Sequence, residues 1–98
     1  MSNETIDNVM KLPAVTDLTF AAILKQRSEQ ALAAGTGLIV DAADTQRIST
    51  PCLQVLVAAA AAFTKAGGPV LEISNPSEVF VEAVSTLGLD GALGVTRA

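Results

Sequence analysis

Short continuous apolar runs alternate along this chain with longer segments that carry helix-start and helix-stop signals. Leu38-Ile39-Val40 ends at Asp41, and the run from Val70 to Ser74 follows a glycine-proline turn. Such runs are typical of strands that are covered on both faces of a parallel sheet. The alternation predicts an α/β domain with a small sheet, mixed or largely parallel, of about four strands with helices packed against it. We expect one face of so small a sheet to be thinly covered.

Two long helices are predicted from their capping residues. The first starts at Asp17 or Thr19 and continues to about residue 34, where glycines follow. Its inner side is expected to hold Phe20, Ile23, Leu24, Ala31 and Leu32. The second starts at Thr50-Pro51, with the threonine as N-cap and the proline at the first helical position, and it ends at the next glycine pair.

The remaining elements are marked by prolines. A weak first strand is expected around residues 9–15, where Pro13 suits a strand end or an edge. A third helix is expected after Asn75-Pro76, with the asparagine as cap and a glutamate three residues on. Residues 89–95 should form a short helical turn and a packed end.

The chain is long enough for one domain. It has 98 residues, of which 50% are hydrophobic, so it can bury one core. We assign the domain to residues 9–95 and treat residues 1–8 as a polar N-terminal segment without signal-peptide character. The longest apolar stretch, residues 52–63, is shorter than the roughly 20 residues that span a bilayer. These features predict a soluble, cytoplasmic protein that does not insert into membranes.

The composition excludes several kinds of site. Histidine is absent and Cys52 is the single cysteine, which rules out a Ser-His-Asp triad, a histidine-ligated metal and an internal disulfide. Six basic residues against ten acidic ones give a net charge of -4, which argues against nucleic acid as a partner. We see no glycine-rich phosphate loop, and we expect no enzyme activity, no metal and no cofactor.

Two hydroxyl groups, on Ser49 and Thr50, lie where the second helix is expected to begin. First-turn N–H groups lack helical partners and the helix dipole is positive there, so a phosphate on either hydroxyl would meet hydrogen-bond donors. It would also add about -1.5 to -2 units of charge. The pattern therefore has two interpretations, a phosphorylation switch or a simple threonine N-cap.

Three neighbouring groups have alternatives of their own. Cys52 in the first helical turn could have a lowered thiol pKa, but no base or second cysteine accompanies it, so packing is the simpler role. Asp41 and Asp44 could hold a cation, or they could be solvated loop residues. Arg47 could contact a phosphate or an acidic partner, or it could be an ordinary exposed side chain. The apolar residues around the second helix suit either core packing or a docked protein.

The order of these motifs resembles the STAS domain of bacterial anti-sigma-factor antagonists. That family has a hydrophobic strand ending in Asp, a short loop, Ile-Asp-Ser-Ser-Gly-Leu and an apolar helix. Asp41, Ile48 and Leu53 lie at the matching positions. The resemblance covers nearly the whole chain, and its further matching segments are residues 12–19, 67–68, 70–77 and 87–90. The Leu-Pro-Ala and Leu-Gln-Val-Leu segments are similar to those of short stand-alone STAS proteins encoded beside bacterial chemotaxis genes.

The resemblance implies a non-enzymatic regulatory module that binds a protein, either a Ser/Thr kinase of the anti-sigma class or a histidine-kinase-like ATPase. However, Pro51 occupies the family's usual phosphoacceptor position, and the N-terminal part has room for about one strand instead of a hairpin. The acceptor is then Thr50 or Ser49, or the protein is a constitutive subunit of a chemotaxis assembly or an ABC-type lipid transporter. The residues expected to bind the partner are Asp41, Arg47, Ser49, Thr50, Pro51 and Cys52.

Overall fold

Parallel strands form the centre of the fold in the computed structural model, which describes residues 9–68 and 70–95. The strands β1 (Val9–Lys11), β3 (Leu38–Asp41) and β5 (Leu71–Ser74) make a three-stranded sheet in the order β1-β3-β5. A separate two-stranded sheet pairs β2 (Val15–Thr16) with β4 (Arg47–Ile48), also in parallel. The predicted α/β class and parallel pairing are confirmed, but the expected single sheet of about four strands is divided into two.

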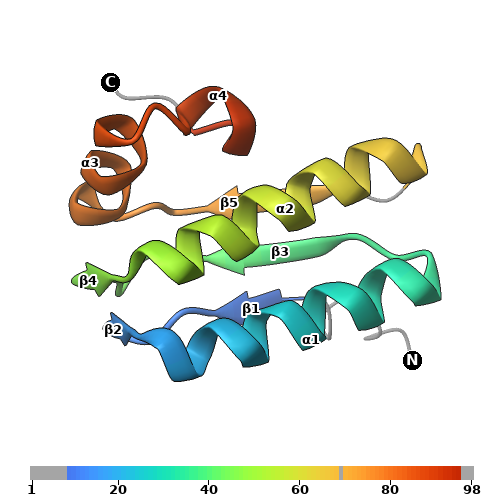
Figure 1. Cartoon of the computed structure of the whole chain (residues 1–98), viewed down its shortest axis with the longest axis horizontal. Coiled ribbons are helices and arrows are strands. Elements are labelled where there is room, and N and C mark those ends of the chain that lie inside the picture. The colour runs from blue at the N-terminus through green and yellow to red at the C-terminus, as the bar shows by residue number, and fades with distance from the viewer. Residues whose placement is uncertain (1–8, 69, 96–98) are drawn as a thin grey trace.

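Two long helices cover one face of the three-stranded sheet. In Figure 1, α1 (Leu18–Ala34) and α2 (Thr50–Ala66) lie side by side in front of the strands. The shorter helices α3 (Glu78–Thr86) and α4 (Asp90–Leu93) lie beyond β5. One end of the molecule, at the left of Figure 1, therefore brings together β2, β4 and the first turns of both long helices.

The two faces of the three-stranded sheet differ in burial. The register places Met10, Val40 and Ile73 in one row, and the first two are buried in the hydrophobic core. The next row holds Val9 and Glu72, which are both exposed, on either side of the half-buried Ile39. Because side chains alternate between faces along a strand, this second row belongs to the opposite face. Its exposure agrees with the expectation of one thinly covered face.

The expected strand over residues 9–15 is interrupted at Pro13. The last hydrogen bond between the start of this segment and the central sheet is donated by the Leu12 N–H to the Asp41 carbonyl at 2.9 Å. After Leu12 the chain leaves the central sheet, and Val15 pairs with Arg47 in the second sheet instead. The N-terminal part thus contributes two short strands to two sheets, where the sequence predicted about one.

Helix α1 has the predicted N-cap and, apart from Ile23, the predicted inner side. Asp17 caps it by accepting a hydrogen bond from the Phe20 N–H, and Gly35 ends it in the left-handed conformation. The buried positions are Ala21, Leu24, Ser28 and Ala31. Ile23 is 47% exposed, so its expected place on the inner side was wrong. Phe20 and Leu32 are partly buried against the core, as expected for the inner side.

The third helix begins later than predicted. Ser77 is its N-cap and accepts a hydrogen bond from the Phe80 N–H, whereas Asn75 lies before the helix with φ 48°. An N-cap residue has an extended backbone, as Ser77 does, whereas Asn75 lies in the left-handed region and does not cap a helix that would start at Pro76. The tail agrees with its prediction, because α4 is a single short turn and Leu93 and Val95 are buried.

Within the described residues, no helix is both long and apolar enough to cross a membrane. The predictions made for residues 1–8 lie outside the described part.

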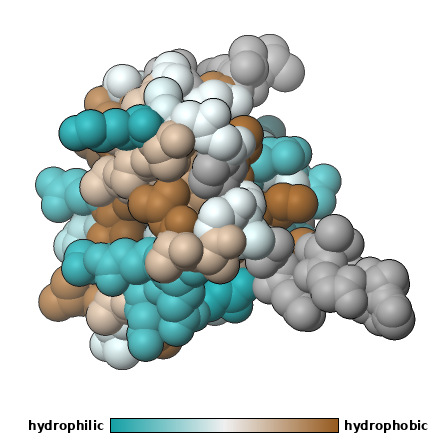
Figure 2. Space-filling model, turned by 90° about the vertical axis from the view of Figure 1, so that its right-hand side faces the viewer, coloured by the Kyte–Doolittle hydropathy of each residue, from teal (hydrophilic) through white to brown (hydrophobic). Residues whose placement is uncertain are grey.

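Figure 2 shows the end of the molecule opposite to β4, where hydrophobic residues occupy the middle of the view and hydrophilic residues lie around them. Val70, which leads into β5, is 66% exposed.

Candidate functional site

Ser49, and not Thr50, is the N-cap of α2. Its N–H donates to the Thr16 carbonyl at 2.9 Å, so the chain stays extended at Ser49 (φ -80°, ψ 154°). From this position the Ser49 Oγ accepts a hydrogen bond from the Cys52 N–H at 3.4 Å. The prediction of a threonine cap with Pro51 at the first helical position is therefore wrong by one residue. The pairing of β2 with β4 decides the cap, and the local sequence does not contain that information.

The hydroxyl group of Thr50 is consequently available. Thr50 is the first residue of α2, its side chain is exposed, and its hydroxyl has no hydrogen bond among the described residues. The first turn of α2 contains no acidic side chain. The positive end of the helix dipole is therefore not neutralised by the helix itself, which favours an anionic group at this position.

Pro51 and Cys52 differ from Thr50 in their exposure. Pro51 is half-buried, and Cys52 is fully buried. The Cys52 thiol donates to the Asp17 carbonyl at 3.1 Å, which joins the first turn of α2 to the N-cap of α1. Of the six residues predicted to bind a partner, Cys52 is thus placed where its side chain does not reach the surface. The interpretation of Cys52 as a packing residue agrees with this position.

Arg47 lies next to the two hydroxyl groups along the chain. Its side chain is exposed, and within the described part of the chain it forms no ion pair. Its backbone is fixed, because the Arg47 carbonyl accepts a hydrogen bond from the Thr16 hydroxyl at 3.0 Å. A fixed backbone with an uncommitted guanidinium group is suited to bind a carboxylate or a phosphate.

Asp41 and Asp44 have roles within the loop that follows β3. The Asp41 Oδ1 accepts a hydrogen bond from the Ala43 N–H at 3.0 Å, as in an Asx turn. The Asp44 carboxylate pairs with Lys11 at 3.2 Å, with both side chains largely exposed. No group of three or more potential ligands for a metal ion occurs in residues 9–68 and 70–95. Asp41 thus stabilises the loop after β3 and Asp44 pairs with Lys11, and the described residues show no contact of either carboxylate with the Ser49 or Thr50 hydroxyl.

Two exposed apolar residues adjoin this end of α2, and the sequence reasoning missed them. Val15 is 51% exposed and is the register partner of Arg47, so their side chains lie on the same face of the two-stranded sheet. Leu18 is 69% exposed and directly follows Asp17, the residue bonded to Cys52. The position of Leu18 right after an N-cap aspartate was a usable signal, because the first helical residue seldom faces the core. We call Val15, Leu18, Arg47, Ser49, Thr50 and Pro51 the α2-start surface.

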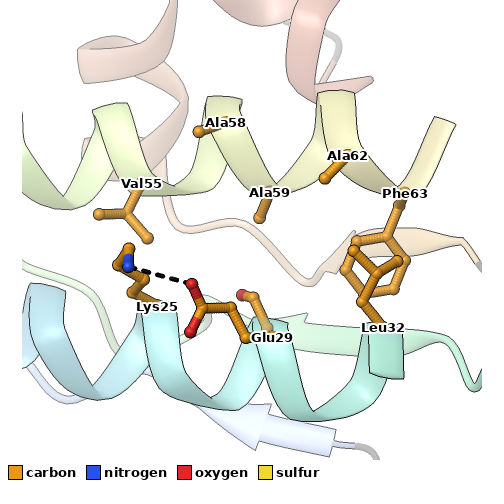
Figure 3. Close-up of a pocket in the computed structure, with 9 residues that line it drawn as sticks. Lys25, Glu29, Leu32, Val55, Ala58, Ala59, Ala62 and Phe63 are labelled. Atoms are coloured by element: carbon orange, nitrogen blue, oxygen red, sulfur yellow. Dashed lines mark ion pairs between the residues drawn. The ribbon is translucent and has the colours of Figure 1, made fainter. Parts of the chain in front are cut away.

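A second feature is an apolar hollow between α1 and α2, drawn in Figure 3. Its volume is about 170 Å³, and its α2 side is formed mainly by small side chains. In Figure 3, Leu32 and Phe63 lie together at one end, and the Lys25–Glu29 ion pair, with 3.0 Å between the charged atoms, lies at the rim. Helix α2 was predicted to be apolar on several sides. In the structure one of these sides is buried and another lines this hollow.

A family model described as "Mlab, STAS domain" matches residues 2–96, which is nearly the entire chain. No curated protein matches it with significant similarity. The model matches both the segment that forms the α2-start surface and the sheet and helices that support it. The chain therefore belongs to the STAS domain family.

Proposed function

We propose that this STAS domain binds a partner protein through the α2-start surface and that phosphorylation of Thr50 weakens the complex. Membership of the family supports a regulatory or binding module in general terms. The observation that carries the proposal is the Thr50 hydroxyl, which is exposed and without a hydrogen bond in the described structure. Ser49 is the weaker candidate acceptor, because its hydroxyl is engaged as the N-cap of α2.

The surroundings of Thr50 explain why charge there would matter. Val15 and Leu18 offer exposed apolar area that a partner would bury. A phosphate at Thr50 would bring about two negative charges to the edge of that area, and their desolvation would oppose association. It would also neutralise Arg47 as a contact for an acidic group on the partner.

The resemblance to anti-sigma-factor antagonists suggests the class of partner. It is a Ser/Thr kinase of the anti-sigma class or a histidine-kinase-like ATPase, in a sigma-factor or chemotaxis pathway. Such a partner would supply both the binding surface and the phosphate, so one contact at Thr50 would serve recognition and switching. The protein itself then needs no catalytic group, in keeping with the lack of histidine and the burial of Cys52.

The proposal is tested with two variants of the same helix. Thr50→Glu places negative charge on the α2-start surface, while Thr64→Glu places it at an exposed position near the other end of α2. The partner is captured from the host with the tagged wild-type protein, and the affinities of all three proteins for it are measured by calorimetry. We expect at least a roughly tenfold weaker complex for Thr50→Glu and near wild-type affinity for Thr64→Glu. Equal affinities for the two variants would remove the α2-start surface as the binding site.

Pro51 favours a second candidate function. It stands at the residue where the family usually carries its phosphoacceptor, which suits a constitutive subunit of a chemotaxis assembly or an ABC-type lipid transporter. The intact mass of the protein purified from its own host separates the two functions. A phosphorylated fraction that maps to Thr50 supports the switch, and its absence under all growth conditions supports the constitutive subunit.

A further inference from the structure

Ser77 joins the start of α3 to the loop that leads to the α2-start surface. Its hydroxyl donates to the Thr45 carbonyl at 2.6 Å, and its N–H donates to the Ala42 carbonyl at 3.1 Å. Both acceptors belong to the loop between β3 and β4. The contact between Ser77 and Thr45 spans 32 residues of sequence, so it is a tertiary contact and not a local turn.

The Ser77 hydroxyl has two functions at once. It donates a hydrogen bond to the loop, and as the N-cap of α3 it accepts one from the Phe80 N–H at 3.1 Å. A cap requires the acceptor alone, and any of several side chains supplies that. The donated bond to Thr45 is an additional feature, and its short length indicates a well-formed contact.

The loop held by Ser77 leads directly into the site. After Thr45, the N–H groups of Gln46 and Arg47 both donate to the Ala14 carbonyl, and the chain then reaches Ser49. The Thr45 side chain does not secure the loop, since its buried hydroxyl lacks a partner within the described residues. Thr45 is therefore held through its backbone N–H and carbonyl groups, and the carbonyl is held by the hydrogen bond from the Ser77 hydroxyl.

The loop has room to move if this bond is lost. Residues 43–46 and the start of α3 border an open, shallow hollow together with Ala14. Neither α1 nor α2 is among the elements that line this hollow. Water could thus reach the Thr45 carbonyl once the Ser77 hydroxyl is removed, and the loop would gain alternative conformations.

From this geometry we infer that Ser77 is a positioning residue for the α2-start surface. It fixes Thr45 and thereby the segment that carries Arg47 and Ser49, although it belongs to a different helix. The inference rests on the proposed function, because that function makes this segment a binding site. Ser77 itself need not contact the partner, and its effect is transmitted through the β3–β4 loop.

The test separates positioning from capping by measuring amide hydrogen exchange, residue by residue, in the wild-type protein and four variants. Ser77→Asp keeps a good N-cap acceptor but has no proton to donate to Thr45, whereas Ser77→Thr keeps both functions. Ser77→Ala loses both, and Ser85→Ala on the same helix is the control. In Ser77→Asp we expect the amides of Thr45 to Arg47 to exchange roughly tenfold faster, while those of Phe80 and Val81 stay protected. Ser77→Thr should restore the wild-type rates.

The outcomes decide the inference without any partner protein. If Ser77→Ala accelerates exchange at Phe80 and Val81 alone, Ser77 is a cap and nothing more, and the inference is wrong. Unchanged rates at Thr45 to Arg47 in Ser77→Asp overturn it as well, even if Ser77→Ala fails to fold. In either case the proposed function is untouched, since its own test is the affinity of Thr50→Glu for the captured partner.

Discussion

Cys52 donates a hydrogen bond from its thiol to the backbone carbonyl of Asp17 at 3.1 Å, which connects the starts of the two long helices. Asp17 also caps α1 through its side chain. This one residue therefore follows β2, begins α1 and holds the first turn of α2. This contact places the exposed Leu18 beside the first turn of α2. A surface suitable for a partner thus arises from packing between α1 and α2, which are separated along the chain by β3 and β4.

The first prediction concerns the reactivity of the Cys52 thiol. Because the side chain is fully buried and its proton is bonded to Asp17, alkylation by a neutral reagent at pH 7 should require opening of the structure. We expect native protein to react at least roughly a hundredfold more slowly than protein in denaturant. Rates measured with a thiol reagent under both conditions test this. A native rate close to the denatured one would revive a redox or catalytic role for Cys52.

A second prediction distinguishes the two hydroxyl groups at the start of α2. Ser49→Ala removes the N-cap and should lower the free energy of unfolding by about 1 kcal/mol. Thr50→Ala removes an exposed side chain without a hydrogen bond, and its effect should stay within about 0.5 kcal/mol. Denaturant titrations of both variants measure the difference. If Thr50→Ala were the more destabilising change, the assignment of Ser49 as the cap would be wrong.

The sequence was sufficient for the main architecture because its signals there are local. The apolar runs at β3 and β5, the Asp17 cap and the glycines after both long helices depend on neighbouring residues alone. The errors arise where partners distant in sequence decide the outcome. The β4 strand has two residues and exists because β2 lies beside it, and this pairing also moves the N-cap from Thr50 to Ser49.

The same distinction applies to the candidate site. The segment around Ser49 and Thr50 could be predicted, because hydroxyl residues before an apolar helix form a recognisable pattern. A packing role for Cys52 was also expected, but which hydroxyl is available and the exposure of Val15 could not be predicted. Each of these depends on how α1 packs against α2 and how β2 pairs with β4, and the local sequence does not specify either contact.

A third prediction concerns the hollow between α1 and α2. Ala62 lines it and is partly buried, and in Figure 3 it lies next to Phe63 on α2. Ala62→Leu should fill part of the hollow with apolar surface and raise the free energy of unfolding by about 1 kcal/mol. Ala61→Leu, at the adjacent exposed position that does not line the hollow, is the matched control and should change stability little. Equal effects of the two variants would show that the hollow does not accept a side chain.

The last prediction concerns two buried threonines with different hydrogen bonding. Thr45 has a buried hydroxyl without a partner among the described residues, whereas the buried Thr16 hydroxyl donates to the Arg47 carbonyl. Valine has nearly the shape of threonine without the hydroxyl. Thr45→Val therefore removes an unpaired polar group and should stabilise the protein by about 1 kcal/mol, while Thr16→Val removes a buried hydrogen bond to the Arg47 carbonyl and should destabilise it by about 1 kcal/mol.

Thermal and denaturant unfolding of both variants give the two signs directly. Opposite signs are expected because the substitutions are chemically identical and the sites differ in the partner of the hydroxyl. A destabilising Thr45→Val would mean that this hydroxyl is hydrogen-bonded in solution, through a water molecule or a shifted loop. The β3–β4 loop would then have a side-chain anchor besides Ser77, and the effect of Ser77→Asp on amide exchange at Thr45 to Arg47 should shrink accordingly.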